Sequence, residues 1–468
     1  MNIKNYLYGL CKGVVLKRSR RWQSESEVRD LELWDLEGNE KNHLSVQGLD
    51  TLELVNQYGS PLFVVNKRCL MRDAEELKQA FQRAPEGSKV LYSYKTNCIP
   101  GIVRSLHEVG IGAEVISPYE LWLAEQLAVP GDMILYNGVD KTEASLERAI
   151  RMGILSTNID HVEEVDRIYR VATRLNKRAN VGVRLALYTG SQFGLDLENG
   201  EALDVCKTIK SLSEHLEFQC VHFNVTSNAK TAQVHRECAV RAIEFARELK
   251  DTTGLTVPYL NIGGGFGVPT TKNMSGIEYG MYRTFGVLPR PPRLRDSQPI
   301  SEFLHEVIST VEEACKRQQL EMPRLIIEPG RLITSRAEFL LASVRAIKRR
   351  SNGQVFAITD AGRHSVTYPC DFEYHEVFVA GRPGAPMNAS YEVKGRICTS
   401  ADWMFKNRLL PELKADDILA VMDAGAYFSS YSSNFAFPRP VIVMVDNGIA
   451  SVIRHEETFE HLIAMDSF

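Results

Sequence analysis

The sequence lacks the features that mark membrane-spanning, secreted or zinc-binding proteins. No apolar run approaches the ~18 residues that a membrane-spanning helix needs. The nine cysteines are scattered and include no Cys-x-x-Cys pair. This spacing argues against a structural zinc site and a disulfide framework, and it fits a reducing compartment. Lysines interrupt the first sixteen residues and no small-residue cleavage site follows them, which is not typical of a signal peptide. We therefore expect a cytoplasmic protein.

The chain also lacks a strong net charge. Lys and Arg number 55 against 59 Asp and Glu, which leaves a formal net charge of -4 over 468 residues. Such a balanced chain has no global field that attracts phosphate backbones, so we expect no nucleic-acid partner. The content of 44% hydrophobic and 24% charged residues excludes a disordered chain. The length is compatible with two or three domains.

Short apolar runs alternate with segments of helical period through the middle of the chain. This alternation predicts a parallel sheet with crossover helices. Because the repeats number close to eight, we expect a (β/α)8 barrel of the TIM type, with its active site at the carboxyl ends of the strands. The runs expected as strands are Leu62–Asn66, Val90–Tyr94, Gly112–Ser117, Met133–Tyr136, Leu155–Ile159, Val181–Leu185, Phe218–Phe223, Tyr259–Ile262 and Leu325–Ile327.

After about Ala337 the rhythm changes to strand-like runs separated only by turns, which predicts an antiparallel β domain. We expect an irregular N-terminal arm over 1–25, a barrel over 60–337, and a β domain built from 26–59 and 338–468. Residues 268–299 are rich in Pro, Gly and Arg and are expected to form a long insertion beside the barrel mouth. Residues 51–58 are expected to form a helix capped by Asp50 and ended by Gly59.

Two motifs follow predicted barrel strands and carry groups suited to catalysis. Lys95 ends the run Tyr92-Ser93-Tyr94-Lys95, where it could act as a Schiff-base amine, although from this residue alone a solvated lysine at the end of a strand is the better interpretation. Three adjacent glycines, Gly263 to Gly265, expose backbone N–H groups that favour an anion such as phosphate over a mere tight turn. The segment matches neither the dinucleotide fingerprint nor the P-loop.

Three further motifs are informative only in combination. Ile327-Glu328-Pro329-Gly330-Arg331 places a carboxylate and a guanidinium after another strand, where they could bind a ligand or pair with each other. Cys398, close to Asp402, could donate a proton, or it could be a buried core cysteine. Tyr427 follows a strand and a turn, and carries little meaning alone.

Together these motifs, by order and spacing, resemble the fold-type III pyridoxal-phosphate decarboxylases, the family of the diaminopimelate and ornithine decarboxylases. The resemblance runs from Tyr58-Gly59-Ser60-Pro61 to Glu456-Glu457-Thr458. It implies an alanine racemase-like barrel with a C-terminal β domain, pyridoxal 5'-phosphate as cofactor and a small amino-acid substrate. It also implies a head-to-tail homodimer with shared active sites. No metal is implied.

The resemblance assigns roles to individual positions. Lys95 resembles the Schiff-base lysine, Glu328 the partner of the ring nitrogen, and Cys398 the proton donor that reaches the partner subunit's active site. The residues expected to hold the cofactor are Lys95, Glu114, Arg184, Asn224, Ser227, Gly264, Gly265, Glu328, Gly330, Arg331 and Tyr427. The residues expected to bind substrate are Arg331, Arg363, Thr399, Asp402 and Tyr427.

Three positions depart from the family pattern. Asn224 stands where a histidine stacks on the cofactor ring. Thr399 follows the cysteine where the diaminopimelate and ornithine enzymes have an acid that holds the distal amino group. The stretch 366–371 contains no arginine for a distal carboxylate, and Arg363 is the nearest substitute.

These departures lead us to expect decarboxylation of an amino acid or derivative other than diaminopimelate, carrier-linked ones included. The Cys-Thr pair is similar to the specialised-metabolism branch of the family. The alternatives are an amino-acid racemase or lyase on the same fold, and a non-catalytic regulatory homologue that binds pyridoxal phosphate. Retention of Lys95, Cys398 and Asp402 favours a decarboxylase over both.

Overall fold

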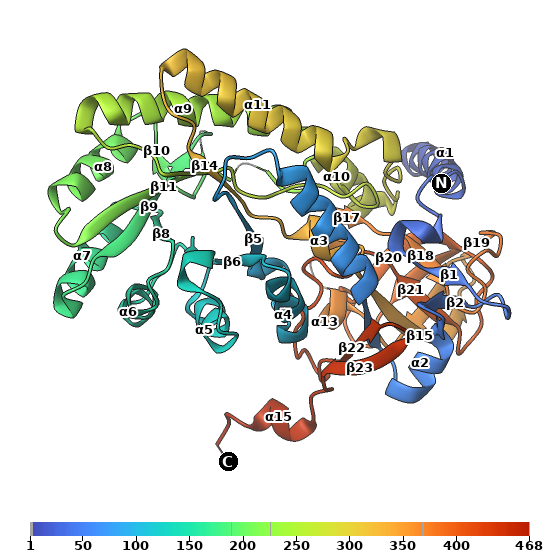
Figure 1. Ribbon diagram of the computed structural model, residues 1–468. Helices are drawn as coiled ribbons and strands as arrows, with labels where there is room; N and C mark the ends of the chain where they lie inside the picture. The colour runs from blue at the N-terminus through green and yellow to red at the C-terminus, as the bar shows by residue number, and fades with distance from the viewer. Residues whose placement is uncertain (1–2, 189, 225, 367–368, 468) are drawn as a thin grey trace. The chain divides into compact units, whose positions relative to one another are not determined.

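The computed structural model describes residues 3–188, 190–224, 226–366 and 369–467 (Figure 1). The chain divides into two compact units. Unit 1 comprises residues 1–72, 268–297 and 333–468, and unit 2 comprises residues 73–267 and 298–332. Each unit is built around its own sheet.

Unit 2 is a closed barrel of parallel strands, which confirms the predicted fold class. Among the described residues, eight strands follow the order β9-β11-β12-β14-β5-β6-β7-β8, and β8 pairs with β9 to close the ring. The strands are largely buried, as expected where helices cover a parallel sheet. Their bounds are β5 Lys89–Ser93, β6 Gly112–Val115, β7 Ile134–Tyr136, β8 Ser156–Ile159, β9 Ala179–Ala186, β11 Leu216–His222, β12 Tyr259–Asn261 and β14 Arg324–Ile327.

Helices follow the barrel strands along the chain. Figure 1 shows α9 and α11 running side by side on the outside of the barrel, where the two helices contact each other. The helices of this part of the chain are α3 Lys67–Phe81, α4 Pro100–Glu108, α5 Pro118–Gln126, α6 Glu143–Met152, α7 Glu163–Leu175, α8 Glu201–Ser211, α9 Gln233–Thr253, α11 Ile300–Gln318 and α12 Arg331–Thr334. The remaining short elements are β10 Leu195–Asp196, η2 Tyr94–Thr96 and η3 Gly131–Met133.

The first predicted barrel strand belongs to the other sheet. Leu62–Asn66 forms β4, which pairs antiparallel with β15 (Glu338–Arg349) and parallel with β22 (Val441–Asp446). All five residues of β4 are buried. A continuous apolar run of this length is typical both of a barrel strand and of the central strand of another buried sheet. Hydrophobic periodicity therefore could not show to which sheet the strand belongs. The barrel begins instead at β5.

Unit 1 contains a large sheet with the order β20-β19-β16-β15-β4-β22-β23, and β21 joins β15 to β18. Most of its pairings are antiparallel as predicted, but β16 pairs parallel with β19, and β4 parallel with β22, so the sheet is mixed. The strands not yet bounded are β16 Val355–Thr359, β18 Val377–Val379, β19 Ala389–Lys394, β20 Trp403–Leu410, β21 Ile418–Val421 and β23 Ile449–Arg454. Shorter elements are η1 Leu31–Trp34, β1 Glu37–Gly38, β2 Leu44–Val46, β3 Leu49–Asp50, α13 Arg363–Val366, α14 Pro369–Phe372, β17 Glu373–Tyr374 and α15 Phe459–Ile463.

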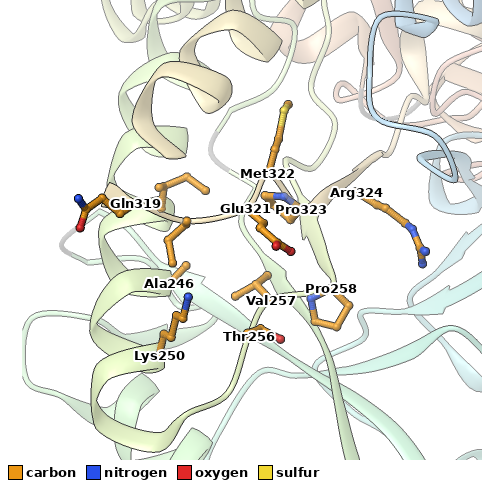
Figure 2. Close-up of a pocket in the computed structure, with 12 residues that line it drawn as sticks. Ala246, Lys250, Thr256, Val257, Pro258, Gln319, Glu321, Met322, Pro323 and Arg324 are labelled. Atoms are coloured by element: carbon orange, nitrogen blue, oxygen red, sulfur yellow. The ribbon is translucent and has the colours of Figure 1, made fainter. Parts of the chain in front are cut away.

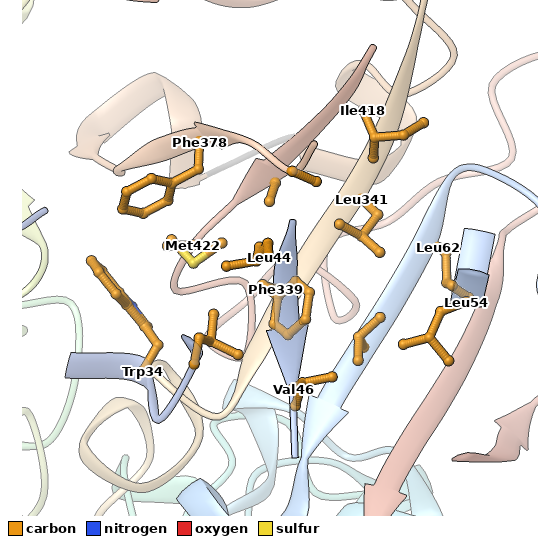
Figure 3. Packing of buried hydrophobic residues seen from close by; sticks show 14 of the residues in the cluster. Trp34, Leu44, Val46, Leu54, Leu62, Phe339, Leu341, Phe378, Ile418 and Met422 are labelled. Carbon is orange, nitrogen blue, oxygen red and sulfur yellow. The ribbon is translucent and has the colours of Figure 1, made fainter. Parts of the chain in front are cut away.

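A hydrophobic cluster fills unit 1 (Figure 3). Trp34, Phe339, Phe378 and Met422 are all buried in it. Trp34 also packs edge-on against Phe378, with ring centroids 6.0 Å apart. The cluster therefore joins a segment near the N-terminus to strands some 300 residues later in the chain.

Two segments predicted to be irregular contain helices. Residues 3–24 form α1 (Ile3–Ser24), where an irregular arm was predicted. The Ser19 hydroxyl donates to the Leu288 carbonyl at 2.9 Å, and Gln23 accepts from Leu409 N–H at 2.8 Å. Because these contacts are polar, the helix shows no apolar period in the sequence. No helix among the described residues is long and apolar enough to cross a membrane.

Residues 268–297 of the predicted 268–299 insertion lie within unit 1 and contain regular elements rather than a long irregular loop. These elements are β13 (Lys272–Asn273), α10 (Gly276–Phe285) and η4 (Leu294–Asp296). Ser275 and Glu278 form a capping box at the start of α10. The predicted helix over residues 51–58 is confirmed as α2, with the Asp50 side chain accepting from Leu52 N–H at 2.9 Å.

Candidate functional site

Polar side chains converge at the carboxyl ends of the barrel strands. Lys95 follows β5, Glu114 lies on β6, and Glu328 follows β14. The Lys95 amine donates to Glu114 Oε2 at 3.0 Å. Glu114 is fully buried, whereas the Lys95 side chain keeps 32% of its exposure. This places a solvent-accessible amine beside a buried carboxylate at the end where barrel active sites lie.

The two carboxylates are joined by an amide that no motif indicated. Asn137 Nδ2, just after β7, donates to Glu114 Oε1 at 3.1 Å and to Glu328 Oε1 at 2.6 Å. Asn261 Nδ2, at the end of β12, also donates to Glu328 Oε1, at 2.5 Å. The Ser93 hydroxyl donates to Glu114 Oε2 at 2.5 Å. The oxygens of both buried carboxylates therefore accept hydrogen bonds from neutral side chains.

His222 and Asn224 come from the end of β11 and lie in the same region. His222 Nε2 is 3.6 Å from Glu328 Oε1, too far for a hydrogen bond. Burial first, and then the charge of Arg184, lower the pKa of His222 well below its ordinary value, so the imidazole is neutral and forms no ion pair. Asn224 Oδ1 and both His222 nitrogens are buried without a hydrogen-bond partner among the described residues.

The predicted glycine loop is a close-packed turn. Gly263 and Gly265 have φ of +70° and +77°. A Cβ on Gly264 would lie 2.1 Å from the Glu328 carbonyl oxygen, which leaves no room for a side chain. The His235 Nε2–H donates to the Gly264 carbonyl at 2.9 Å, and its ring stacks on Phe266. Glu328 after β14 and His235 on α9 therefore hold the loop in place.

Alanine at Gly265 should damage this loop far more than the same change at an open glycine. Its Cβ would lie 2.1 Å from the Thr226 carbonyl oxygen, and its φ of +77° is unfavourable for a side chain. We expect Gly265→Ala to lower the affinity for pyridoxal phosphate by about tenfold or more, measured by fluorescence titration. Gly254→Ala is the matched control, since Gly254 has a φ of +72° with nothing within 4 Å of the added Cβ. Equal losses in both variants would show that backbone strain alone is responsible.

Other predicted cofactor residues lie in the same unit. Arg184, on β9, donates to Asp160 at 3.3 Å and lies over the Phe193 ring. Arg331 begins α12 and is buried. Gly330 packs against Thr96, whose Oγ1 would be 2.1 Å from an added Cβ. Ser227 is exposed. Their roles toward the cofactor remain predictions.

The predicted proton donor and several substrate residues lie in unit 1. Cys398 and Thr399 are exposed, which excludes a buried core cysteine. Asp402 is buried and accepts from the backbone N–H groups of Arg363 at 2.8 Å and Ile397 at 2.6 Å. It therefore orders the loop that carries Cys398, and its predicted contact with substrate remains a prediction.

Arg363 and Tyr427 also have partners within unit 1. The Arg363 guanidinium pairs with both oxygens of Asp371 and lies over the Trp403 ring at 5.0 Å. Tyr427 has a φ of +71° and packs edge-on against Tyr431. Their substrate and cofactor contacts stay predictions. Of the predicted motifs, Thr367, Tyr368 and Val225 lie outside the described residues.

A cavity of about 630 Å³ lies at the other end of the barrel (Figure 2). Pro258 directly precedes β12 and Pro323 directly precedes β14, so their loops lie at the amino ends of these strands. Figure 2 shows Lys250 and Glu321 beside them. None of the predicted catalytic residues lines this cavity. The groups suited to catalysis therefore lie at the opposite end of the barrel, with Lys95.

Sequence reasoning missed Asn137, Asn158, Asn261 and His235. The three asparagines share one signal, because each lies within or directly after a barrel strand, where hydrophobic residues are the rule. A buried amide at such a position needs partners, and the barrel interior supplies them. His235 lies on a helix and gave no comparable signal.

The residues present fit pyridoxal 5'-phosphate. Lys95 supplies an accessible amine and Glu328 a buried carboxylate for a protonated ring nitrogen. The three glycines of the turn carry no side chains that would keep a phosphate from the backbone, although the Gly263 N–H already donates to Asn261 Oδ1 at 2.9 Å. The partnerless polar atoms of His222 and Asn224 are further contacts open to a ligand. No group of three metal-ligating side chains occurs in the part of the chain that the structure describes.

Known proteins are similar to this chain along most of its length. Residues 69–335, more than half of the chain, match the model of the pyridoxal-binding domain of the pyridoxal-dependent decarboxylases. A diaminopimelate decarboxylase of Methanothermobacter thermautotrophicus is 29% identical over 441 residues, covering 92% of this chain and 96% of its own length. A diaminopimelate decarboxylase of Bacillus methanolicus is 28% identical over 445 residues, covering 91% of this chain and 98% of its own.

Solved structures are similar as well. The diaminopimelate decarboxylase of M. jannaschii, crystallised with L-lysine, superposes with a TM-score of 0.81 at 28% identity, covering 92% of this chain and 98% of its own. A lysine/ornithine decarboxylase of Vibrio vulnificus, at 21% identity and a TM-score of 0.70, shares the fold. The chain therefore belongs to the pyridoxal-dependent decarboxylases and is an amino-acid carboxy-lyase that uses pyridoxal 5'-phosphate.

Proposed function

We propose that this chain decarboxylates diaminopimelate. The observation that carries the proposal is its similarity, along nine tenths of its length, to proteins named diaminopimelate decarboxylase. Removal of one carboxylate from diaminopimelate yields lysine, and L-lysine occupies the related M. jannaschii structure. The arrangement of Lys95, Glu114 and Glu328 supports the same reaction class.

The expectation of a substrate other than diaminopimelate is thereby corrected. It rested on Thr399 in place of an acid and on the lack of an arginine in 366–371. The relatives that match nearly the whole chain, at 28–29% identity, carry the diaminopimelate name. Two positions are a weaker guide than this match, because the distal end of a substrate can be bound from other positions. The racemase and binding-only alternatives lose support for the same reason.

The bound cofactor supplies an electron sink for the pair of electrons left when carbon dioxide departs. Lys95 would hold the cofactor aldehyde, and Glu114 would orient the Lys95 amine through the 3.0 Å contact. Glu328 would hold the proton on the ring nitrogen and so favour electron flow into the ring. Cys398 would return a proton to the α-carbon.

The proposal is tested by adding diaminopimelate to the holoenzyme and measuring carbon dioxide release and lysine formation. Ornithine, lysine and arginine serve as comparison substrates. We expect diaminopimelate to have the highest kcat/KM of the set. Stoichiometric carbon dioxide from another amino acid, with none from diaminopimelate, would overturn the assignment.

Replacement of Cys398 should slow turnover without removing the cofactor. For Cys398→Ala we expect kcat to fall by about 10²- to 10⁴-fold, the usual range for loss of a general acid, with an unchanged cofactor spectrum. Ser400→Ala is the control, since Ser400 lies two residues away in the same exposed loop. A fully active Cys398→Ala enzyme would exclude the thiol as the proton donor.

The proposed enzyme is a homodimer in which Cys398 serves the partner's barrel. Light scattering should give twice the chain mass of 52.7 kDa. Mixing the inactive Lys95→Ala and Cys398→Ala chains should restore part of the activity, because one of the two shared sites then has both residues. A persistently inactive mixture that has exchanged subunits would contradict site sharing.

Two finer points complete the proposal. The Cys398-Thr399 pair supports a divergent position in the family, similar in this feature to the specialised-metabolism branch, without changing the proposed substrate. The scattered cysteines support a cytoplasmic location. Fractionation of cells that express the natural protein would test the second point.

A further inference from the structure

Asn137 binds two buried carboxylates of the barrel at once. A single nitrogen, Nδ2, donates to Glu114 Oε1 at 3.1 Å and to Glu328 Oε1 at 2.6 Å. Both carboxylates and Asn137 itself are buried. An amide nitrogen carries two hydrogens, so one N–H is available for each carboxylate. Asn137 is thus placed to bind the partner of Lys95 and the candidate partner of the ring nitrogen at the same time.

The orientation of the Asn137 amide is set by a second amide. Asn158 Nδ2, on β8, donates to Asn137 Oδ1 at 2.8 Å, and Asn158 Oδ1 accepts from the Ser156 hydroxyl at 2.8 Å. A flipped Asn137 would turn its oxygen toward two carboxylates, which cannot donate when ionised. Hydrogen bonds therefore run in one direction, from Ser156 through Asn158 and Asn137 to the two carboxylates.

The Asn137 amide reduces the repulsion between the carboxylates of Glu114 and Glu328. Two carboxylates that share one donor atom repel each other, and burial away from water strengthens this repulsion. Without the two N–H groups of Asn137, more of this negative charge would act on Lys95 and on the ring-nitrogen end of the site.

We propose that Asn137 is a positioning residue that binds the carboxylates of Glu114 and Glu328 through one amide, limits the negative charge that they present, and so couples the Schiff-base lysine to the ring-nitrogen end of the cofactor site. The proposal rests on membership of the pyridoxal-dependent decarboxylases and does not depend on which amino acid is the substrate. Asn158 acts one step further out, by holding the Asn137 amide in its donating orientation.

Other titratable and charged groups near the carboxylates bear on a pH measurement. They are Lys95, Glu120, Lys141, Arg184 and His222. Burial, opposed by the Ile116 N–H and aided by Glu114, raises the pKa of Glu120 to about 7. Each of these groups is retained in the variants below. A difference in the pH midpoint between variants can therefore be attributed to the hydrogen bonds of Asn137.

The test is Asn137→Asp, which preserves shape and replaces the donating nitrogen with an acceptor oxygen. The absorbance of the bound cofactor is titrated with pH in the absence of substrate. Extra negative charge beside Glu114 favours the protonated form of the Lys95–cofactor linkage, so the proton is lost at higher pH. We expect the midpoint to rise by about one pH unit or more. Asn180→Asp is the matched control, since Asn180 lies at the amino end of β9 and donates to the Ile154 carbonyl at 2.8 Å.

Asn158→Ala provides the second variant. It leaves Asn137 in place but removes the amide that orients it, so we expect a smaller rise of the midpoint. If Asn137→Asp fails to fold, the Asn158→Ala titration decides. A midpoint equal to that of the unmodified enzyme in every variant that binds cofactor overturns the proposal, and so does an equal shift in Asn180→Asp. Because no substrate is present, failure of the diaminopimelate assignment would leave these results unchanged.

Discussion

Replacing Lys95 with alanine should abolish the absorbance band of the lysine-bound cofactor and reduce decarboxylation by at least about a thousandfold. The amine at the end of β5 is the group that would join the cofactor covalently, and Glu114 holds it at 3.0 Å. Without it, pyridoxal phosphate would lack its covalent attachment and could bind only through non-covalent contacts. The measurement is absorbance of the reconstituted enzyme, combined with carbon dioxide release.

Lys89→Ala is the matched control for Lys95. Lys89 lies at the other end of the same strand, where its amine pairs with Asp132 at 3.1 Å. We expect normal absorbance and turnover for this variant. Retention of the band in Lys95→Ala would show that another amine binds the cofactor, and would remove the central element of the site.

Glu328→Gln should retain the cofactor and lose most of the activity. Glutamine preserves shape but cannot hold a proton on the ring nitrogen by charge, and its amide can turn a donor toward that nitrogen. We expect kcat to fall by about a hundredfold or more, the usual effect of removing one electrostatic contact from an active site. The cofactor spectrum should shift while cofactor content stays near one per chain.

Another buried carboxylate, Glu164, serves as a control that distinguishes a loss of activity from a loss of stability. Glu164 pairs with the buried Lys141 at 2.9 Å, and burial lowers the pKa of this lysine, although the charge of Glu164 opposes the change. Glu164→Gln should therefore lower the melting temperature, because it leaves a buried charge without its partner. It should leave the cofactor spectrum unaltered. If Glu328→Gln behaves like Glu164→Gln, the role of Glu328 is structural.

Local pattern was sufficient for much of the fold. The strand–helix alternation predicted the barrel because each strand needs a crossover helix, and α2 could be bounded from Asp50 and Gly59 because caps act within one turn. It failed for Leu62–Asn66, which has the same buried apolar pattern in either sheet. It failed again for α1, whose contacts through Ser19 and Gln23 are polar and distant in sequence.

The residues of the candidate site likewise fall into those that sequence motifs indicated and those that no motif indicated. Lys95, Glu114, Glu328 and the glycine turn were visible in the sequence, because each stands in a motif at the end of a predicted strand. Asn137, Asn158 and Asn261 were missed, because a lone asparagine in or directly after a strand does not indicate which distant side chains it contacts. The predicted substrate was wrong, because the prediction gave two positions more weight than a similarity that extends along nine tenths of the chain.

The sequence by itself determined the barrel, the family and the chemical groups, because periodicity, turn residues and short motifs are local properties. The tertiary structure decided which of those groups meet. Glu114, Asn137, Asn261 and Glu328 lie more than 200 residues apart at the extremes, and only closure of the barrel brings their side chains within hydrogen-bond distance. Their coupling depends on three-dimensional proximity in a buried, low-dielectric interior, which no spacing along the chain expresses.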